Sequence, residues 1–396
     1  MSTFTLFFEP LDVLVFRDHR PFMAGQHFLA RSIFPLPSVF FGALRAALLE
    51  RAGARFDKPA FGLEGLAAAV LGDADHPGRL QLRGPLLASD RGKTLDLMLP
   101  WPHDLDIREH DFALVLPEAQ EGPPGLRWDG RTMAEWTGPL PRTRASGKPS
   151  AERFLLTAGG AAKYARASAR GDREFSLARS KESDARGESD YVAEHTILRK
   201  ERRTGLARDA NTLVVDDAML YTIETWRLRE GIGFAVDVGL TGAPNATDAN
   251  FLREALKALH NHVLRLGGKG HHARIRIFER SPLTDLFPPI ESPHSKAWLL
   301  TPSLIAPGDA MMAVGKQIRL GGINLRAGKH PKGPKPLESA LDAGSVLFYR
   351  NTPVHELRGR LARVNDTRGE QTGYPEQAGF GLHAILPYTC DKTTTP

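Results

Sequence analysis

The stretch Leu11–Leu49 restricts the possible folds most, because it predicts a strand, a basic loop and a helix in one compact unit. The apolar run Leu11–Phe16 is typical of a strand and leads into the basic segment Arg17–Arg20. Ser38 is a good N-cap for the helix that follows, and Gly53 is a good residue to end it. This order suits a small α+β domain that holds a polyanion at its edge. It does not suit a nucleotide-hydrolysing pocket.

Strands and helices continue to alternate up to residue 285. The predicted strands are Phe4–Phe8, Leu11–Phe16, a hairpin of Asn211–Val215 and Met219–Leu228, Gly233–Leu240 and Ala273–Phe278, and the predicted helices are Ser38–Ala52 and Asp248–Leu264. The order β-α-β-β-α-β is that of the ferredoxin-like unit, which RNA-recognition domains also use. We therefore expect a first ferredoxin-like domain over residues 1–285, interrupted by a long insertion at about residues 80–210.

Residues 286–396 predict a second, shorter domain of the same kind. Its strands are expected at Ala297–Ile305, Ser345–Arg350 and His383–Tyr388, whereas Ala306–Ser339 is rich in Gly, Pro and Lys and predicts a loop. The predicted fold class is thus α+β, with two ferredoxin-like, RRM-like domains.

The insertion carries the local positive charge of the chain. Pro141–Arg208 contains 16 Lys and Arg against 9 Asp and Glu, and the whole chain has a net charge of +6. Such a bias favours an anionic partner. Within this stretch, Arg142–Gly187 has few large apolar residues, which predicts a mobile loop. This loop either becomes ordered on a partner or is a solvated linker without a role.

The densest basic run is the first candidate for binding a nucleic-acid backbone. It contains Arg199, Lys200, Arg202, Arg203 and Thr204. We expect this run in a loop from which the cationic side chains contact phosphates, an interaction that gives salt-dependent affinity without sequence selection. The alternative is a solvated loop.

Two glycine-rich turns and three separate arginines are further candidates. They comprise Gly267, Gly268, Lys269, Gly270 and His271 in one turn, Gly379 and Gly381 in the other, and Arg17, Arg20 and Arg45. Glycines let backbone N–H groups approach a phosphate closely, but they also commonly end helices. Arg45 is equally well explained as a surface residue of the predicted helix.

Residues that hold metals or cofactors do not form the required patterns. Cys390 is the single cysteine, the 14 histidines lack metal-binding spacing, and neither a Walker A motif nor a dinucleotide fingerprint is present. We expect no metal and no cofactor. The N-terminal residues lack a signal-peptide pattern and no run reaches 18 apolar residues, so we expect a cytoplasmic protein without a membrane segment.

The N-terminal motifs resemble those of a known family. Asp12–Phe22 reads D-x-L-x-F-R-D-x-R-P-F, and Phe34–Leu48 contains F-P-x-P and G-A-L-R-x-A-L. This pattern resembles subunit 3 of the Cmr effector complex of type III-B CRISPR systems, within the RAMP superfamily. The similarity continues in order through Arg202-Arg203-Thr204-Gly205, Met219-Leu220-Tyr221, Leu266-Gly267-Gly268, Gly321-Gly322, Gly344-Ser345-Val346 and Gly379-Phe380-Gly381.

The resemblance implies a non-catalytic RNA-binding and scaffold subunit in antiviral defence. Such a subunit caps the 5′ handle of the CRISPR RNA and docks on the large polymerase-like Cmr subunit and the adjacent backbone subunit. It also implies that the basic run lies near the guide RNA.

Two other functions remain open. One is a metal-independent endoribonuclease of CRISPR precursors, with His271 or His19 as the general acid or base. The other is a protein–protein scaffold with little RNA contact.

Overall fold

The structure is a computed structural model, and it describes residues 4–17, 29–73, 76–108, 111–114, 116–121, 125–128, 133–136, 139–142, 152–172, 175–180, 189–208, 212, 214–242, 245–283, 286–287, 292–304, 310–324, 333–335, 337–358, 360–361 and 376–389. The chain forms two compact units, which are described separately. The first spans Met1–Pro85, Ile197–Glu279 and Arg319–Leu337, and the second spans Leu86–Thr196, Arg280–Ile318 and Glu338–Pro396.

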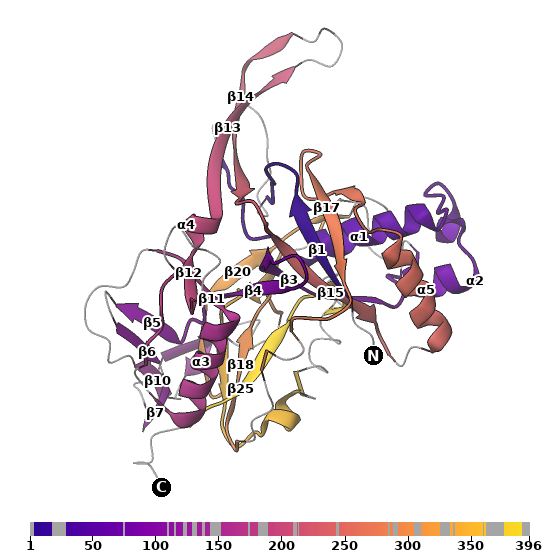
Figure 1. Cartoon of the computed structure of the whole chain (residues 1–396). Coiled ribbons are helices and arrows are strands. Elements are labelled where there is room, and N and C mark those ends of the chain that lie inside the picture. The colour runs from indigo at the N-terminus through magenta and orange to yellow at the C-terminus, as the bar shows by residue number, and fades with distance from the viewer. Residues whose placement is uncertain are drawn as a thin grey trace. The chain divides into compact units, whose positions relative to one another are not determined.

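The first unit is built on an antiparallel sheet with β1 (Phe4–Pro10) in its middle (Figure 1). β1 pairs with β15 (Ile232–Leu240) on one side and with β17 (His272–Phe278) on the other, and β16 (Val263–Arg265) pairs with the far edge of β17. The three strands predicted for this sheet are confirmed.

The other elements of the first unit surround this sheet or extend from it. They are β2 (Leu29–Ala30), α1 (Pro37–Arg51), the 3-10 helix Pro59–Gly62, α2 (Gly65–Leu71), the first part of β3 (Leu80–Asp90), β13 (Leu198–Arg208), β14 (Val215–Leu228), α5 (Ala246–Lys257), β21 (Ile323–Asn324) and β22 (Gly333–Pro334). The strands β13, β14 and β2 form a separate three-stranded sheet in this order.

The helix predicted at Ser38–Ala52 is confirmed as α1, but it begins differently. Its N-cap is Leu36, and Pro37 occupies the first turn, where the missing N–H of proline costs no hydrogen bond. Ser38 is therefore not the N-cap. Gly53 ends the helix as predicted, with φ of +78° and its N–H donating to the carbonyl oxygen of Glu50.

An aromatic cluster fixes α1 and the ribbon strand β14 onto the sheet. The ring of Phe40 in α1 lies 5.1 Å from that of Phe8 in β1 and 5.2 Å from that of Phe234 in β15, between ring centroids. Phe16 contacts both Phe234, at 5.9 Å, and Trp226 in β14, at 6.2 Å. Such aromatic pairs add to stability beyond the apolar area that they bury. The end of β14 around Trp226 is therefore held firmly on the sheet.

Three details predicted for the first unit are wrong. Leu11–Phe16 is buried from Val13 onward but forms only an isolated bridge to β14. The turn expected between Asn211–Val215 and Met219–Leu228 lies instead within the single strand β14. The predicted helix Asp248–Leu264 ends at Lys257. The chain turns at Asn261, whose φ is +61°, so that β16 can pair with β17.

The second unit contains a sheet with the strand order β19-β24-β18-β25. These strands are β19 (Met312–Val314), β24 (Val346–Tyr349), β18 (Ser295–Leu299) and β25 (His383–Pro387). The strands predicted at Ser345–Arg350 and His383–Tyr388 are thus confirmed, and that predicted at Ala297–Ile305 ends earlier, at Leu299.

The remaining elements of the second unit are mostly short strands. They are the second part of β3, β4 (Leu95–Pro100), β5 (Leu105–Arg108), β6 (Asp111–Leu114), β7 (Leu116–Glu121), β8 (Gly125–Trp128), β9 (Met133–Trp136), β10 (Pro139–Arg142), β11 (Phe154–Thr157), α3 (Ala158–Arg170), β12 (Tyr191–Ala193), β23 (Glu338–Leu341) and the 3-10 helix Glu376–Ala378. Three elements cross the division between the units, namely β3, α4 (Glu194–Ile197) and β20 (Gln317–Leu320).

Two predicted loops contain regular structure. The segment Arg142–Gly187 includes β11 and α3, where Thr157 caps the helix by accepting from the N–H of Gly160. The segment Ala306–Ser339 includes several short strands from β19 onward. α3 was not predicted, because its buried residues are small apart from Tyr164 and therefore give no pattern of large apolar side chains at helical spacing.

A buried polar network joins α3 to β18 in the second unit. The Lys296 ammonium lies 2.6 Å from a carboxylate oxygen of Asp104, whose other oxygen accepts from the hydroxyl of Tyr164 at 2.6 Å. The side chains of Lys296 and Asp104 are completely buried. Such a pair specifies one arrangement of the core, because either charge alone is costly to bury.

The two compact units divide the segment that was predicted as an insertion, residues 80–210. Residues 86–196 belong to the second unit, whereas residues 80–85 and 197–210 belong to the first. The predicted boundaries, 1–285 and 286–396, remain a prediction for two ferredoxin-like domains. Among the described residues, no helix has the length and apolar character needed to span a membrane.

Candidate nucleic-acid interface

The basic run lies on a strand and not in the predicted loop. Its residues belong to β13, which pairs with β14 in an antiparallel ribbon that extends away from the sheet of the first unit (Figure 1). The register places Arg199 opposite Arg227, Lys200 opposite Trp226 and Arg202 opposite Glu224. The basic side chains are therefore held at fixed spacing on a ribbon.

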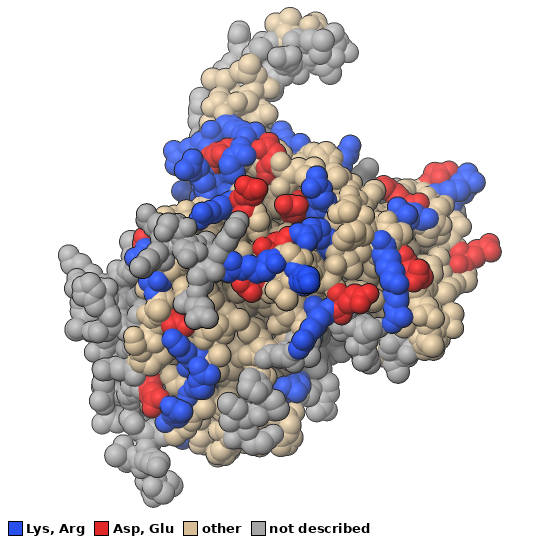
Figure 2. Space-filling model, viewed as in Figure 1, with Lys and Arg blue, Asp and Glu red and all other residues tan. Residues whose placement is uncertain are grey.

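The part of the ribbon nearest the sheet carries most of this charge. We define the ribbon base as residues 198–203 and 223–229, which contain six Lys and Arg against two Glu, a net charge of +4. Arg199, Lys200, Arg202 and Arg203 are all exposed. Figure 2 shows Lys and Arg side chains gathered around this part of the ribbon.

Strand alternation divides the basic run between two faces. One face carries Arg199, Arg203 and, between them, Glu201. The other face carries Lys200, Arg202 and Thr204. Lys200 lies 3.9 Å from the Glu224 carboxylate and 6.0 Å from the ring centroid of Trp226. Cations thus point to both sides of the ribbon, and each side also holds a glutamate.

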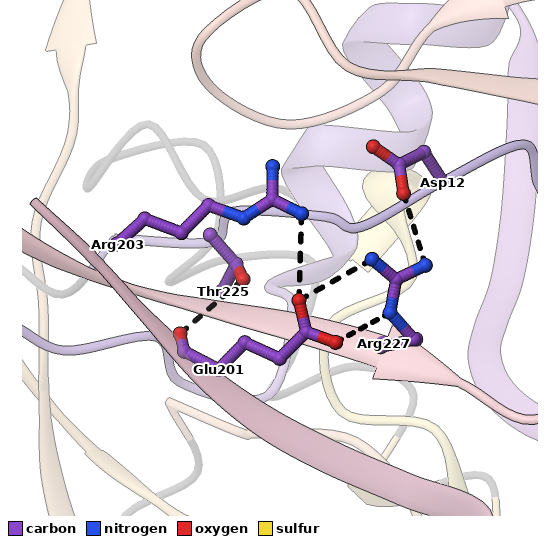
Figure 3. A network of polar contacts seen from close by, with 5 residues as sticks. All are labelled: Asp12, Glu201, Arg203, Thr225 and Arg227. Carbon is purple, nitrogen blue, oxygen red and sulfur yellow. Dashed lines mark hydrogen bonds and ion pairs between the residues drawn. The ribbon is translucent and has the colours of Figure 1, made fainter. Parts of the chain in front are cut away.

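A polar network organises the first of these faces (Figure 3). The Arg227 guanidinium donates to both oxygens of Glu201, through Nε at 2.5 Å and through a terminal nitrogen at 3.3 Å. Its other terminal nitrogen donates to Asp12 at 3.0 Å. Arg203 donates to Glu201 at 3.4 Å, and Thr225 donates to the Glu201 backbone carbonyl at 3.3 Å. Arg227, which lies in β14, therefore connects Asp12 in the N-terminal segment with Glu201 in β13.

The network keeps its members charged. The hydrogen bond to Glu201 raises the pKa of Arg227, and the hydrogen bond from Arg227 lowers the pKa of Glu201. Burial opposes ionisation of Asp12, but the Val13 N–H and Arg227 outweigh it and lower the pKa of Asp12. Two arginines and two carboxylates are thus balanced in charge at neutral pH.

The glycine turn Gly267–His271 joins β16 to β17, so the explanation that these glycines end a helix is wrong, whereas their role in binding remains a prediction. Gly267 has φ of +79°, and a Cβ there would lie 2.6 Å from the carbonyl oxygen of Val15. The Gly268 N–H donates to the same oxygen at 2.8 Å. This backbone donor is engaged within the protein, and the turn presents its side chains instead.

The turn brings two predicted residues to the ribbon. The Lys269 ammonium lies 4.9 Å from the ring centroid of Tyr221 in β14. That ring lies across Gly205 in β13, where a Cβ would be only 2.2 Å from it. Burial lowers the pKa of His271, Asp12 raises it, and Arg203 lowers it further. Lys269, His271 and Arg203 therefore form one cluster.

Other predicted residues are placed elsewhere. Arg17 is exposed and forms a bridge with Ser32, whereas Arg20 lies outside the described residues. The Arg45 guanidinium donates to the backbone carbonyls of Leu71 at 2.7 Å and Asp73 at 2.5 Å. Arg45 therefore holds the end of α2, and it is not part of the cluster at the ribbon.

The second glycine turn is in the second unit and is internally bonded. Gly379 and Gly381 have φ of +102° and +73°. The Gly379 carbonyl accepts from the hydroxyl of Thr301 at 2.8 Å, and the Gly381 N–H donates to Pro302 at 2.8 Å. The structure thus uses this turn to join β18 and β25, and its binding role remains a prediction.

The site also contains residues that the sequence reasoning missed. Arg227 and Tyr221 lie in a predicted strand, but their roles depend on the register with β13, which the chain alone does not reveal. Asp12 belongs to the N-terminal motif, yet only the fold brings it to Arg227. Within the described part of the chain, no group of three or more His, Cys, Asp or Glu side chains is arranged to hold a metal ion.

Comparisons with known proteins agree with this architecture. A chain in "Cryo-EM structure of the Type III-B Cmr-beta bound to cognate target RNA and AMPPnP, state 1" is similar, with a TM-score of 0.50, 14% identity, and coverage of 95% of this chain and 94% of that chain. A chain in "Crystal structure of Csm3-Csm4 subcomplex in the type III-A CRISPR-Cas interference complex" gives a TM-score of 0.41, 12% identity, and coverage of 89% and 98%. The first likeness supports a mixed α/β fold with large antiparallel sheets, as in Cmr proteins of the RAMP type.

Sequence comparison identifies the family directly. No curated protein matches the chain significantly. A family model described as "CRISPR-associated protein (Cas_Cmr3)" matches residues 6–388, which is nearly the whole chain. The chain therefore belongs to the Cas_Cmr3 family of CRISPR-associated proteins.

Proposed function

We propose that this protein is a non-catalytic RNA-binding and scaffold subunit of a type III-B CRISPR effector complex, acting in the cytoplasm in antiviral defence. In this role it caps the 5′ handle of the CRISPR RNA. It docks on the large polymerase-like subunit and on the adjacent backbone subunit. Family membership supports a place in a CRISPR assembly, and the ribbon base supports contact with RNA.

The observation that carries the proposal is the arrangement of cations at the ribbon base. Arg199, Lys200, Arg202 and Arg203 are exposed on a paired strand, and Lys269 and His271 lie beside that strand. Fixed guanidinium groups bind phosphates through paired donors and lose less conformational freedom than residues of a loose loop. Because both faces of the ribbon carry cations, the RNA backbone could bind along either face.

We also propose that each unit contains one ferredoxin-like domain. In the first unit the order β3-β15-β1-β17, with α1 after β1 and α5 after β15, is consistent with that fold. In the second unit the order β19-β24-β18-β25 is the same pattern, and residues 354–358 are helical between β24 and β25.

Binding to labelled handle RNA tests the proposed function. The purified protein, alone and with its large partner subunit, is titrated with handle RNA and with a scrambled RNA over a salt series. We expect handle-preferring binding that R202A/R203A weakens. The salt slope should fall by about 0.7 for each phosphate of single-stranded RNA that the variant no longer neutralises. R51A/R55A, which removes two exposed arginines at the end of α1 and after it, is the matched control.

Two results would contradict the proposal. Equal loss of affinity in R202A/R203A and R51A/R55A would mean that net charge and not the ribbon governs binding. Absence of RNA binding, both alone and with the partner subunit, would leave only the protein–protein scaffold.

A second candidate function is a metal-independent endoribonuclease of CRISPR precursors. His271 favours it, because this imidazole lies within the basic cluster and its lowered pKa keeps it neutral, as a general base requires. His19, the other residue predicted for this role, lies outside the described residues. The same titration includes a gel lane that scores cleavage of repeat RNA without metal. Cleavage by the lone chain that is lost in H271A would establish this function; we expect none.

A further inference from the structure

Two guanidinium groups from different strands converge on one oxygen at the ribbon base. The same Glu201 oxygen, Oε2, accepts from Arg227 at 3.3 Å and from Arg203 at 3.4 Å (Figure 3). Convergent guanidinium donors of this kind are the usual environment of a bound phosphate oxygen. Here a carboxylate of the protein itself occupies that position.

The two arginines are held very differently. Arg227 makes a two-point contact with Glu201, with Nε at 2.5 Å, and a further bond to Asp12 at 3.0 Å. Arg203 contacts Glu201 through one long bond of 3.4 Å, and 44% of its side chain is exposed. Arg203 is thus the member of the network that changes partner most easily.

We infer that Glu201 is a built-in counter-ion in the position of an RNA phosphate, and that bound RNA replaces it at Arg203. This inference rests on the proposed function. Arg203 leaves the Glu201 carboxylate and pairs with a backbone phosphate of single-stranded RNA. Arg227 keeps Glu201 and Asp12, so it is a positioning residue that holds the ribbon strands and the N-terminal segment around the exchange.

Electrostatics favours this exchange over simple addition of RNA. In the free protein Glu201 and Asp12 offset the charges of Arg203 and Arg227, which limits the mutual repulsion of the two arginines. A phosphate arriving at Arg203 releases Glu201 to Arg227 alone, and every charge keeps a partner. Because exposed ion pairs are weak and screened by solvent, breaking the long bond between Arg203 and Glu201 does not prevent binding.

The distribution of charge around Arg203 also supports a phosphate there. His271 is close enough for the charge of Arg203 to act on it, and Lys269 is in the same turn. Once Arg203 turns from Glu201, it joins these two side chains on one side of the ribbon. Arg202, the next residue in the run, does not take part in this exchange, because it lies on the opposite face of the ribbon and is paired with Glu224 in the strand register.

Removal of the counter-ion charge tests the inference. In E201Q the side chain keeps its size and one acceptor but no longer competes with phosphate. We expect this variant to bind handle RNA roughly twofold to fivefold more tightly at low salt, the size of effect typical of one exposed ion pair. E224Q removes the same charge from the other face of the ribbon base and is the matched control, with a smaller effect.

A double-mutant cycle separates partner exchange from general electrostatics. If Glu201 acts through Arg203, the gain from E201Q disappears when R203A is already present. Persistence of the full gain in E201Q/R203A, or an equal gain in E224Q, would overturn the inference while leaving RNA binding intact. If wild-type protein binds no RNA in any condition, the proposed function itself has failed.

The salt slope tests the positioning role of Arg227. R203A removes a cation that pairs with phosphate and should lower the slope by about 0.7, whereas R227A should weaken binding with the slope unchanged. R227K, which keeps the charge and can still pair with Glu201, should recover most of the affinity. An equal fall in slope for R227A and R203A would show that Arg227 itself contacts phosphate, and it would overturn the positioning role.

Discussion

At the scale of single residues, several cations of the first unit are paired with carboxylates. Glu201 accompanies Arg203 and Arg227, Glu224 accompanies Lys200 at 3.9 Å, and Glu9 lies 3.9 Å from Arg274. A count of basic residues therefore overstates the electrostatic field that RNA would meet at the proposed interface. What matters is which cations can leave their carboxylates, and the distances between the charged atoms distinguish them.

His271 should make the affinity for RNA depend on pH. Burial lowers its pKa below the usual 6.5, with Asp12 raising it and Arg203 and His272 lowering it. The free protein thus holds a neutral imidazole at pH 7, and a phosphate beside it favours protonation. Binding then takes up a proton, so we expect RNA affinity to rise as the pH falls below about 6.5.

The measurement is RNA affinity as a function of pH in wild type, H271Q and H260Q. The gain at low pH should be smaller in H271Q, whereas H260Q removes an exposed histidine after α5 and should keep it. Identical pH profiles in all three would exclude His271 from the interface. The folding stability of the protein should change in the opposite direction. Because the unfolded chain protonates this imidazole more readily than the folded protein does, the free energy of unfolding should decrease as the pH falls below about 6.5.

Lys296 forms a fully buried ion pair in the core of the second unit. Its ammonium is fully buried against Asp104, and it also lies 4.2 Å from the ring centroid of Tyr164. K296M leaves Asp104 as a buried charge without its ion-pair partner and should lower the free energy of unfolding by about 3–5 kcal/mol. K296M/D104N removes that charge but keeps an acceptor for Tyr164, so it should be the more stable variant. Chemical denaturation measures both, and a double variant less stable than K296M would contradict this account.

At the scale of elements, the ribbon is positioned by its contacts with the rest of the first unit. Leu14 and Trp226 form an isolated bridge with reciprocal backbone hydrogen bonds of 2.8 Å. Phe16 and Phe34 pack on Trp226. The turn Gly267–His271 is bonded to Val15, beside that bridge. The N-terminal segment thus connects the ribbon to the turn that presents Lys269.

The glycine turn allows a matched test of this connection. Gly267 and Gly270 both have positive φ, but a Cβ at Gly267 would meet the Val15 carbonyl at 2.6 Å, whereas a Cβ at Gly270 meets nothing within 4 Å. G270A should cost about 1–2 kcal/mol for its backbone conformation alone. G267A should cost more and should also weaken RNA binding, because the turn must move away from the N-terminal segment. Equal costs, measured by denaturation, would mean that the approach of Gly267 to Val15 is unimportant.

Sequence patterns predicted the elements whose structure depends on local periodicity. β15 lies where its apolar residues predicted it, although both of its faces and not only one are buried, α1 follows its apolar spacing, and β24 and β25 lie where they were predicted. The ribbon was missed for a local reason. β13 and β14 are consecutive strands, but the sequence of β13, LRKERRTGLAR, lacks the alternation of apolar and polar residues that predicts a strand, so it was expected as a loop.

The candidate site was predictable only in part, because its residues come from segments that lie far apart in the sequence. Arg203, Lys269 and His271 were identified separately from charge and glycine content, and the fold brings them together. Arg45 was predicted from its charge, but its donors are taken by carbonyls at the end of α2. Arg227 was missed, because its importance comes from the partners that it joins and not from its neighbours in sequence.

At the scale of the whole molecule, the chain forms two compact units, and we propose different tasks for them. The first unit carries the ribbon, the turn and the charge network, which form the proposed RNA interface. The second unit carries a buried polar network and an apolar cluster around Ala297 and Leu347. We expect substitutions in the second unit to change stability and assembly with little direct effect on RNA binding.

The most direct test of the central claim is to map protein–RNA crosslinks in the reconstituted assembly. Photoreactive handle RNA is bound by this protein with its partner subunits, and the crosslinked peptides are identified by mass spectrometry. The account predicts crosslinks concentrated in residues 198–228 and 263–272, and it predicts that R202A/R203A abolishes those at the ribbon base. Crosslinks confined to the second unit, with the ribbon peptides unmodified, would contradict it.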